Sequence, residues 1–227
     1  MTASRTAIVT GAASGIGAAT VSALVQEGYR VVAVDRDFGD PSRTDQVVEV
    51  PLDVRDERGC VSLVASQEEP PALLVNAAAV RPDAPILEHS ADMWRTAFDV
   101  NVLGAFNLLR AVVPQMSPGG SIVNVASGAA LGKRGLAAYG ASKAALISMS
   151  RTAAIELQEA GVRVNVVIPG STETPMFAVA GSVAGGARNV GGRVLSAADV
   201  AGGIVRTAHD PMLSGAAVPV GLLPATW

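Results

Sequence analysis

A tyrosine and a lysine stand four residues apart in the segment AAYGASKAAL, residues 137–146. The chain has 17 basic residues, and only two of them, Lys133 and Lys143, are lysines. On a helix, residues i and i+4 share one face, so the Tyr139 phenol and the Lys143 ammonium would lie together. A free phenol has a pKa of about 10, and a nearby positive charge favours the phenolate. The pair predicts a base for a substrate hydroxyl, although an isolated pair of this kind is more often a solvated surface contact.

A second chemical feature is the glycine-rich turn TGAASGIG, residues 10–17, which directly follows a short apolar run. Glycines let the chain turn tightly and let backbone N–H groups approach a phosphate at the start of the next helix. A tight turn from strand to helix without any ligand is the alternative. In the dinucleotide interpretation, the contacts come from Gly11, Ser14, Gly15, Ile16 and Gly17.

The type of dinucleotide is indicated by Asp35, which ends the run RVVAVD. An acidic residue stands about 20 residues beyond the glycine turn in dinucleotide-binding folds. Its carboxylate accepts hydrogen bonds from the adenosine ribose hydroxyls and repels a 2′-phosphate. Arg36 follows it and could meet such a phosphate, whereas Ser14 brings no positive charge. The sequence therefore favours NAD over NADP, with Arg36 as a further cofactor contact.

The elements that must position these side chains alternate along the chain. Short apolar runs predict strands at residues 6–10, 30–35, 47–52, 72–76, 121–126, 162–168 and 216–220. Helical patterns lie at 15–27, 56–67, 91–116, 139–160 and 197–208. Most strand runs are almost continuously apolar, as in parallel strands that are buried on both faces. This alternation predicts an α/β fold, a single Rossmann-type domain over residues 1–227, with a doubly wound parallel sheet of about seven strands and helices on both faces.

The composition limits the classes of function. The formal net charge is −3, so there is no basic footprint for nucleic acid or for an anionic membrane. The single cysteine excludes an internal disulfide, and no Cys/His cluster has the spacing of a metal site. No apolar run reaches the roughly 18 residues of a membrane span, and no signal peptide precedes the first strand. We therefore expect a cytoplasmic protein without a metal.

Taken together, TGxxxGIG and YGASK resemble the motifs of the short-chain dehydrogenase/reductase family, and the resemblance covers nearly the whole chain. It implies a catalytic set of Asn101, Ser127, Tyr139 and Lys143, in which Ser127 holds the substrate oxygen. It also implies further NAD contacts around the adenine, after the fourth strand and around the nicotinamide. These are Asp53, Val54, Asn76, Ala77, Ala78, Tyr139, Lys143, Pro169, Gly170, Thr172 and Thr174.

Within the family, the stretches VDRDF, VNVASGAA and VIPGSTETPM are most similar to the cyclic dihydrodiol dehydrogenases, such as 2,3-dihydro-2,3-dihydroxybenzoate dehydrogenase. This implies hydride transfer between NAD and a secondary alcohol or ketone, with a cyclic dihydrodiol acid as one candidate substrate. Lys133 and Arg134 are then either a solvated basic turn or a pair that binds a substrate carboxylate. A ketoreductase of the 3-oxoacyl-carrier-protein type is the alternative enzyme. A dinucleotide sensor or scaffold is the alternative without catalysis.

Three features depart from the family pattern. Ala79 stands where the family has glycine, and the interval from Ser127 to Tyr139 is one residue shorter than usual. Residues 171–195 would form only a short Gly/Ala-rich substrate lid, which is either a surface loop or a flap over a cleft. The long helices predicted at 91–116 and 139–160 imply a homodimer or homotetramer, because the family pairs them across two-fold axes.

Overall fold

A computed structural model of the protein describes residues 5–178 and 193–222. Its strands are β1 (Thr6–Thr10), β2 (Arg30–Asp35), β3 (Val47–Pro51), β4 (Pro71–Asn76), β5 (Ser121–Val125), β6 (Arg163–Pro169) and β7 (Ala217–Val220). The main helices are α1 (Gly15–Gln26), α2 (Glu57–Ala65), α3 (Ala91–Phe98), α4 (Gly104–Val112), α5 (Ala137–Glu156), α6 (Pro175–Ala178) and α7 (Ala197–His209). Each predicted strand is present within one residue of its expected ends.

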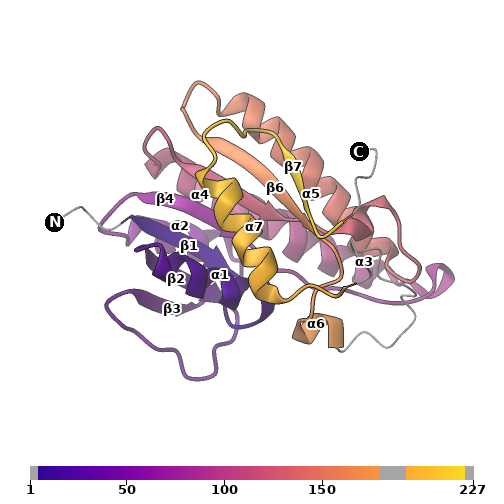
Figure 1. The fold of residues 1–227 in the computed structure, drawn as a ribbon. Helices are drawn as coiled ribbons and strands as arrows, with labels where there is room; N and C mark the ends of the chain where they lie inside the picture. The colour runs from indigo at the N-terminus through magenta and orange to yellow at the C-terminus, as the bar shows by residue number, and fades with distance from the viewer. Residues whose placement is uncertain (1–4, 179–192, 223–227) are drawn as a thin grey trace.

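All strands lie in one parallel sheet with the order β3-β2-β1-β4-β5-β6-β7. The chain starts in the middle at β1, winds outward to β3, and then crosses back to β4 on the other side of β1. Figure 1 shows this change of direction at the centre of the sheet. The doubly wound prediction is therefore confirmed. In such sheets, ligands bind outside the carboxyl ends of the strands at the point where the winding reverses.

Two helical layers cover the sheet. The helices α1 and α7 pack together on one face, and α2, α4 and α5 lie on the other (Figure 1). Alternate strand residues point to opposite faces, so Ile8 and Val32 join the core beneath α2 and α4, while Val9 and Val31 join the core beneath α1 and α7. Burial on both faces explains why the strands read as apolar runs.

The predicted helix 91–116 is one helical run with a π-helical turn, η2 (Asp99–Leu103), between α3 and α4. Such turns interrupt the regular helix and often lie at functional sites. By length and composition alone, the helical run Ala91–Gln115 could cross a membrane, because its mean hydropathy is 1.3. The sequence did not predict this, since the run is interrupted by polar residues. Its inner residues Leu108 and Val112 are fully buried in the core, as in a helix that covers a sheet.

The predicted lid, residues 171–195, is described only at its two ends. After β6, the chain forms the four-residue helix α6, and residues 179–192 lie outside the described part. The ends are joined because the Leu195 N–H donates to the Ser171 carbonyl at 2.9 Å and the Glu173 N–H donates to the Leu195 carbonyl at 2.8 Å. These bonds join the two described ends of the segment to each other.

Candidate active site

The carboxyl ends of the strands open into a cleft of about 1000 Å³. It lies at the point between β1 and β4 where the winding reverses. Of the predicted site residues, all line the cleft except Asn76 and Asn101. Those that line it are Gly11, Ser14, Gly15, Ile16, Gly17, Asp35, Arg36, Asp53, Val54, Ala77, Ala78, Ser127, Tyr139, Lys143, Pro169, Gly170, Thr172 and Thr174.

The glycine turn fits closely against the end of β4. Gly11 has a φ of +67°, and a Cβ there would lie 2.7 Å from the Ala78 nitrogen. A Cβ at Gly17 would lie 2.0 Å from the Gly11 carbonyl oxygen. The hydroxyl of Thr10 accepts hydrogen bonds from the N–H groups of Ala77 and Ala78, both at 3.1 Å. Only glycine allows this packing, and Thr10 fixes the two segments to each other, a role that the sequence motif alone did not assign.

The start of α1 is arranged to receive an anion. Ser14 occupies the cap position, but its side chain makes no capping hydrogen bond, and the first turn of the helix contains no acidic residue. The first N–H groups of a helix have no partner within it, and the helix dipole favours negative charge there. Asp35 holds the glycine turn in place, because its Oδ2 accepts a hydrogen bond from the Ala13 N–H at 3.1 Å. These features fit a bound dinucleotide pyrophosphate.

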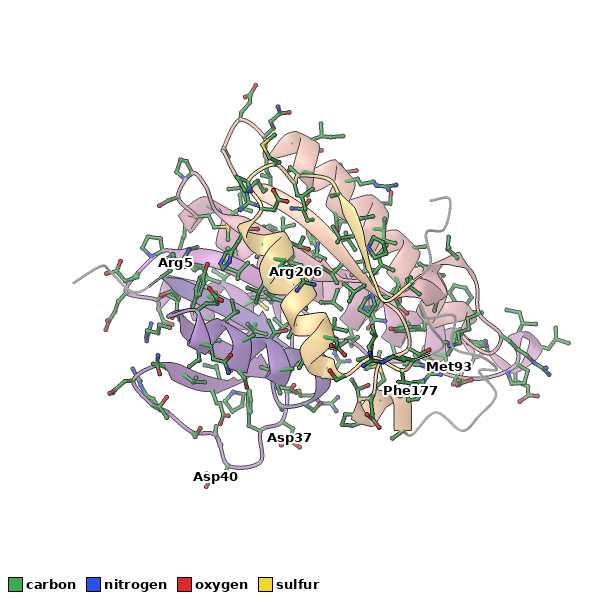
Figure 2. All side chains as sticks on the ribbon, viewed as in Figure 1. Arg5, Asp37, Asp40, Met93, Phe177 and Arg206 are labelled. Carbon is green, nitrogen blue, oxygen red and sulfur yellow. The ribbon has the colours of Figure 1, made fainter. Side chains whose placement is uncertain are left out.

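Where the chain leaves β3, Asp53 lines the cleft and pairs with a neighbouring guanidinium. The Arg55 Nε donates to Oδ1 and Oδ2 of Asp53 at 3.0 and 3.1 Å. These hydrogen bonds hold the pKa of the Asp53 carboxyl below its usual value, and the charge of Arg36 lowers it further. Arg36 therefore lies close enough to Asp53 for the two charges to interact. The loop that carries Asp37 and Asp40 lies beyond β2 at the edge of the molecule (Figure 2).

The residue after the Asn-Ala-Ala segment, Ala79, lines the cleft without conformational strain. In the described part of the chain, every residue with a positive φ is a glycine. Ala79 therefore has an ordinary backbone conformation, and this position does not require the glycine that the family usually has.

The segment after β6 lines the cleft beside the glycine turn. The Thr172 hydroxyl donates to the Gly170 carbonyl at 3.0 Å, which folds the segment into a turn. A Cβ at Gly15 would lie 3.2 Å from Cγ2 of Thr174, so this turn packs directly on the glycine turn. Phe177 on α6, labelled in Figure 2, also lines the cleft and is partly exposed.

Three of the four predicted catalytic side chains meet in the cleft. Lys143 is 2% exposed, and its Nζ donates to the Val125 carbonyl at 2.7 Å and lies 5.8 Å from the centre of the Tyr139 ring. Ser127 follows β5, and its Oγ accepts a hydrogen bond from the Ala129 N–H at 3.2 Å. The Ser127 side chain also lies close enough to the Tyr139 phenol to lower its pKa. The serine, tyrosine and lysine side chains therefore lie together in the cleft.

The electrostatics of this group differ from the expectation. Burial lowers the pKa of Lys143 to about 7. Burial also raises the pKa of Tyr139, and the hydrogen bond with Ser127 and the charge of Arg81 only partly oppose this. The sequence predicted that Lys143 would lower the Tyr139 pKa. Burial of the phenol opposes that effect, and a lysine with a pKa of about 7 carries only part of a charge at neutral pH.

The fourth predicted catalytic residue, Asn101, does not line the cleft. It is buried in the π-helical turn, where its Oδ1 accepts from the Val80 N–H at 2.8 Å. Its Nδ2 donates to the Val80 carbonyl at 3.0 Å and to the Ser142 hydroxyl at 2.9 Å. The Ser142 hydroxyl donates to the Tyr139 carbonyl at 2.7 Å. The Asn101 side chain thus joins the loop after β4 to the helix that carries Tyr139, and both of its N–H groups are used there.

Asn76, at the end of β4, is likewise buried behind the cleft. Its Nδ2 donates to Oδ1 of Asn124 on β5 at 2.8 Å, and the Asn124 Nδ2 donates to the Ser150 hydroxyl at 2.8 Å. This chain of polar groups joins two strands to α5. Asn76 therefore supports the position of the Ala77 and Ala78 backbone and makes no direct contact with the cleft.

Several residues that line the cleft were not predicted from the sequence, and Arg81 and Leu222 are two of them. Arg81 follows β4, and only 10% of its side chain is exposed. It forms an ion pair with Asp83 at 3.2 Å and donates to the Met176 carbonyl at 3.3 Å. Leu222, after β7, packs beside the Cβ position of Gly128. No motif or spacing marked either one, because their place depends on the path of the loops around the cleft.

No group of three or more His, Cys, Asp or Glu side chains that could hold a metal ion occurs within residues 5–178 and 193–222. The polar side chains that line the cleft are hydroxyls, a phenol, cations and the carboxylates of Asp35 and Asp53. Such groups suit hydride and proton transfer with an organic dinucleotide.

Comparisons with known proteins agree with this geometry. The model of the short chain dehydrogenase family matches residues 5–184. The chain is 44% identical over 174 residues to a 2,3-dihydro-2,3-dihydroxybenzoate dehydrogenase of Escherichia coli (strain K12), covering 74% of this chain and 69% of that protein. It is 37% identical over 186 residues to the 3-oxoacyl-[acyl-carrier-protein] reductase FabG of Thermotoga maritima, covering 76% of each.

Among solved structures, a 4-hydroxyisoleucine dehydrogenase complexed with NADH superposes with a TM-score of 0.85 at 26% identity. The match covers 96% of this chain and 98% of that one. The fold, the cleft and the matched sequence lead to the same conclusion: the chain is an oxidoreductase that belongs to the short-chain dehydrogenase/reductase family.

Proposed function

We propose that the protein is an NAD-dependent dehydrogenase that transfers a hydride between a ring secondary alcohol or ketone and nicotinamide. The observation that carries this proposal is the position of Ser127, Tyr139 and Lys143 in the same cleft as the glycine turn and Asp35. A cofactor site alone would suit a sensor, but this arrangement also provides groups for proton transfer beside the nicotinamide end.

The side chains divide the chemistry of alcohol oxidation among themselves. Ser127 holds the substrate oxygen and stabilises the partial charge that develops there. Tyr139 takes the hydroxyl proton, and Lys143 favours the phenolate when it is charged. A bound dinucleotide supplies the hydride acceptor. The protein positions the carbinol carbon and the base so that the proton and the hydride can leave the alcohol together.

A cyclic dihydrodiol acid is the substrate that we propose, because the similarity to the Escherichia coli dehydrogenase reaches 44% identity. The test is a screen for NAD⁺ reduction with cyclic diols that carry a carboxylate, simple ring alcohols and linear hydroxy acids. We expect the highest kcat/KM for the cyclic acids. NAD binding without turnover of any alcohol would favour the sensor function instead.

The 37% identity to the Thermotoga maritima reductase supports a second candidate, a ketoreductase that acts on acyl-carrier-protein thioesters. That enzyme would run in the reducing direction. NADPH oxidation with a 3-oxoacyl thioester, at a higher kcat/KM than NAD⁺ reduction with any ring alcohol, would favour it. The carboxylate of Asp35 at the end of β2 supports NAD and the first candidate.

The wild-type protein is expected to prefer NAD⁺ over NADP⁺ in kcat/KM by at least about tenfold, because a carboxylate beside a 2′-phosphate costs several kcal/mol. Asp35→Asn should remove most of this preference while the turn is kept, since the amide oxygen can still accept from the Ala13 N–H. Paired kinetics with both dinucleotides measure this. Equal use of both by the wild type, or an unchanged ratio in the variant, would contradict the role of Asp35.

A homodimer or homotetramer is proposed for the assembly. Apolar side chains remain exposed on the two long helices: Leu103 and Phe106 near the start of α4, and Ile155 at the end of α5. Phe106→Glu is expected to reduce the mass in light scattering after gel filtration, because a charge in an apolar interface is costly. Glu69→Gln changes a charge on an exposed loop away from these helices and serves as the control. A monomeric wild type would contradict the proposal. The cytoplasmic location stays a prediction.

A further inference from the structure

Arg81 places a guanidinium at the substrate end of the cleft. Its side chain is 10% exposed, and its charge acts on Tyr139, whose pKa it lowers. Within the described residues, its hydrogen bonds are one to Asp83 and one to the Met176 carbonyl. A guanidinium has five N–H donors in a planar fork. These two contacts hold the head in place and leave donors for a ligand.

A second cation, Lys133, stands on the loop that meets the Arg81 loop, where the Ala84 N–H donates to the Gly135 carbonyl at 3.0 Å. Lys133 is half-buried and lines the same cleft. Its pKa is lowered by burial and by the charge of Arg81, while Asp83 opposes this. Arg134, the next residue, lines the cleft but is exposed. Two cations and one carboxylate, Asp83, therefore lie together at a site that is partly withdrawn from water.

This arrangement is unfavourable without a further anion. Two like charges repel each other, and burial strengthens that repulsion. Asp83 forms an ion pair with Arg81 at 3.2 Å, so one carboxylate faces two cations and the group keeps a net positive charge. A planar carboxylate could accept from the Arg81 fork and from the Lys133 ammonium at the same time.

We propose that Arg81 and Lys133 form a carboxylate-binding subsite that selects ring alcohols with an acidic group near the carbinol carbon. The inference rests on the proposed function and deepens it. It moves the anion-recognition role from the exposed Arg134 of the predicted basic pair to Arg81, which approaches the cleft from a different loop. Because Arg81 also contacts the Met176 carbonyl on α6, a substrate anion there would lie against the start of the lid.

The test compares a hydroxycyclohexanecarboxylate with its carboxamide in NAD⁺ reduction. The wild type should favour the acid in kcat/KM, and Arg81→Met should lower that preference by about tenfold to a hundredfold, as expected for a lost hydrogen bond between charged groups. Lys133→Met should act in the same direction. Arg95→Met is the matched control, because Arg95 lies on the exposed face of α3 and pairs with Asp92. An unchanged acid preference in Arg81→Met would overturn the proposal.

Two further measurements separate this subsite from the function and from folding. Benzoate binding by calorimetry should weaken in Arg81→Met and should be kept or tightened in Asp83→Asn, which removes the competing carboxylate. If no alcohol is turned over but benzoate binding follows this pattern, the proposed function fails and the subsite stands. If ring alcohols are turned over and the wild type treats acid and carboxamide alike, the subsite fails and the function stands. If Arg81→Met does not fold, the Lys133 and Asp83 variants decide.

Discussion

Tyr139→Phe is expected to lower kcat by about 10²–10⁴-fold, the usual contribution of a positioned acid or base. The variant loses only the phenolic oxygen, so the ring keeps its place against Lys143 and the core. The dinucleotide contacts of the glycine turn and Asp35 are untouched. NAD affinity should therefore change little, and the loss should appear in kcat rather than in KM.

The chain provides a matched control for this experiment in Tyr29, its only other tyrosine. Tyr29 is buried at the far end of β2, where its hydroxyl pairs with His209 at 3.0 Å. Tyr29→Phe should keep turnover close to that of the wild type. Dinucleotide binding by fluorescence titration and steady-state rates measure both variants. Near-normal turnover in Tyr139→Phe would show that another group accepts the proton.

Lys143→Met is expected to have two opposite effects, a loss of turnover by about 10²-fold or more and a gain in thermal stability. Lys143 is buried, and its folded pKa of about 7 lies below its ordinary value of 10.5. Between these values the unfolded chain binds more protons than the folded one, so the free energy of unfolding increases as the pH rises from 7 to 10.5. The destabilising effect of the buried lysine is therefore largest at and below pH 7. Methionine has a similar length and carries no charge to desolvate.

The gain in Tm of Lys143→Met should therefore be largest at and below pH 7 and should shrink as the pH approaches 10.5. The lost hydrogen bond to the Val125 carbonyl offsets part of the gain at every pH. Thermal unfolding across this pH range, with Arg95→Met as the control for a lost surface cation, measures the effect. A variant that is less stable at every pH, or one that keeps its activity, would contradict the account of Lys143.

The strands and the glycine turn could be predicted because local sequence determines them. Ala7, Val9 and Val31 are buried whatever the details of the loops, so their apolar runs mark the sheet directly. Gly11 has a positive φ and no room for a Cβ, so only glycine fits there. The sequence motif therefore marks this position directly. The pairing of Tyr139 with Lys143 follows from helical periodicity, and Ser127 joins them because β5 ends beside the helix.

The features that could not be predicted depend on the tertiary path of the chain. Arg81 reaches the cleft only because the loop after β4 folds back towards α6. Asn101 turns away from the cleft because the π-helical turn aims its amide at the backbone of Val80. Burial raises the pKa of Tyr139, and the spacing of residues on a helix does not show how deeply a side chain is buried. These effects need the distances between segments that are remote in the sequence.

The most direct test of hydride transfer uses a ring alcohol that carries deuterium on the carbinol carbon. The protein is incubated with this alcohol and NAD⁺, and the dinucleotide is analysed by mass spectrometry. The account predicts that the wild type forms NADH that carries the deuterium and that Tyr139→Phe forms almost none. Bound NAD⁺ that gains no deuterium from any cyclic or linear alcohol would contradict it.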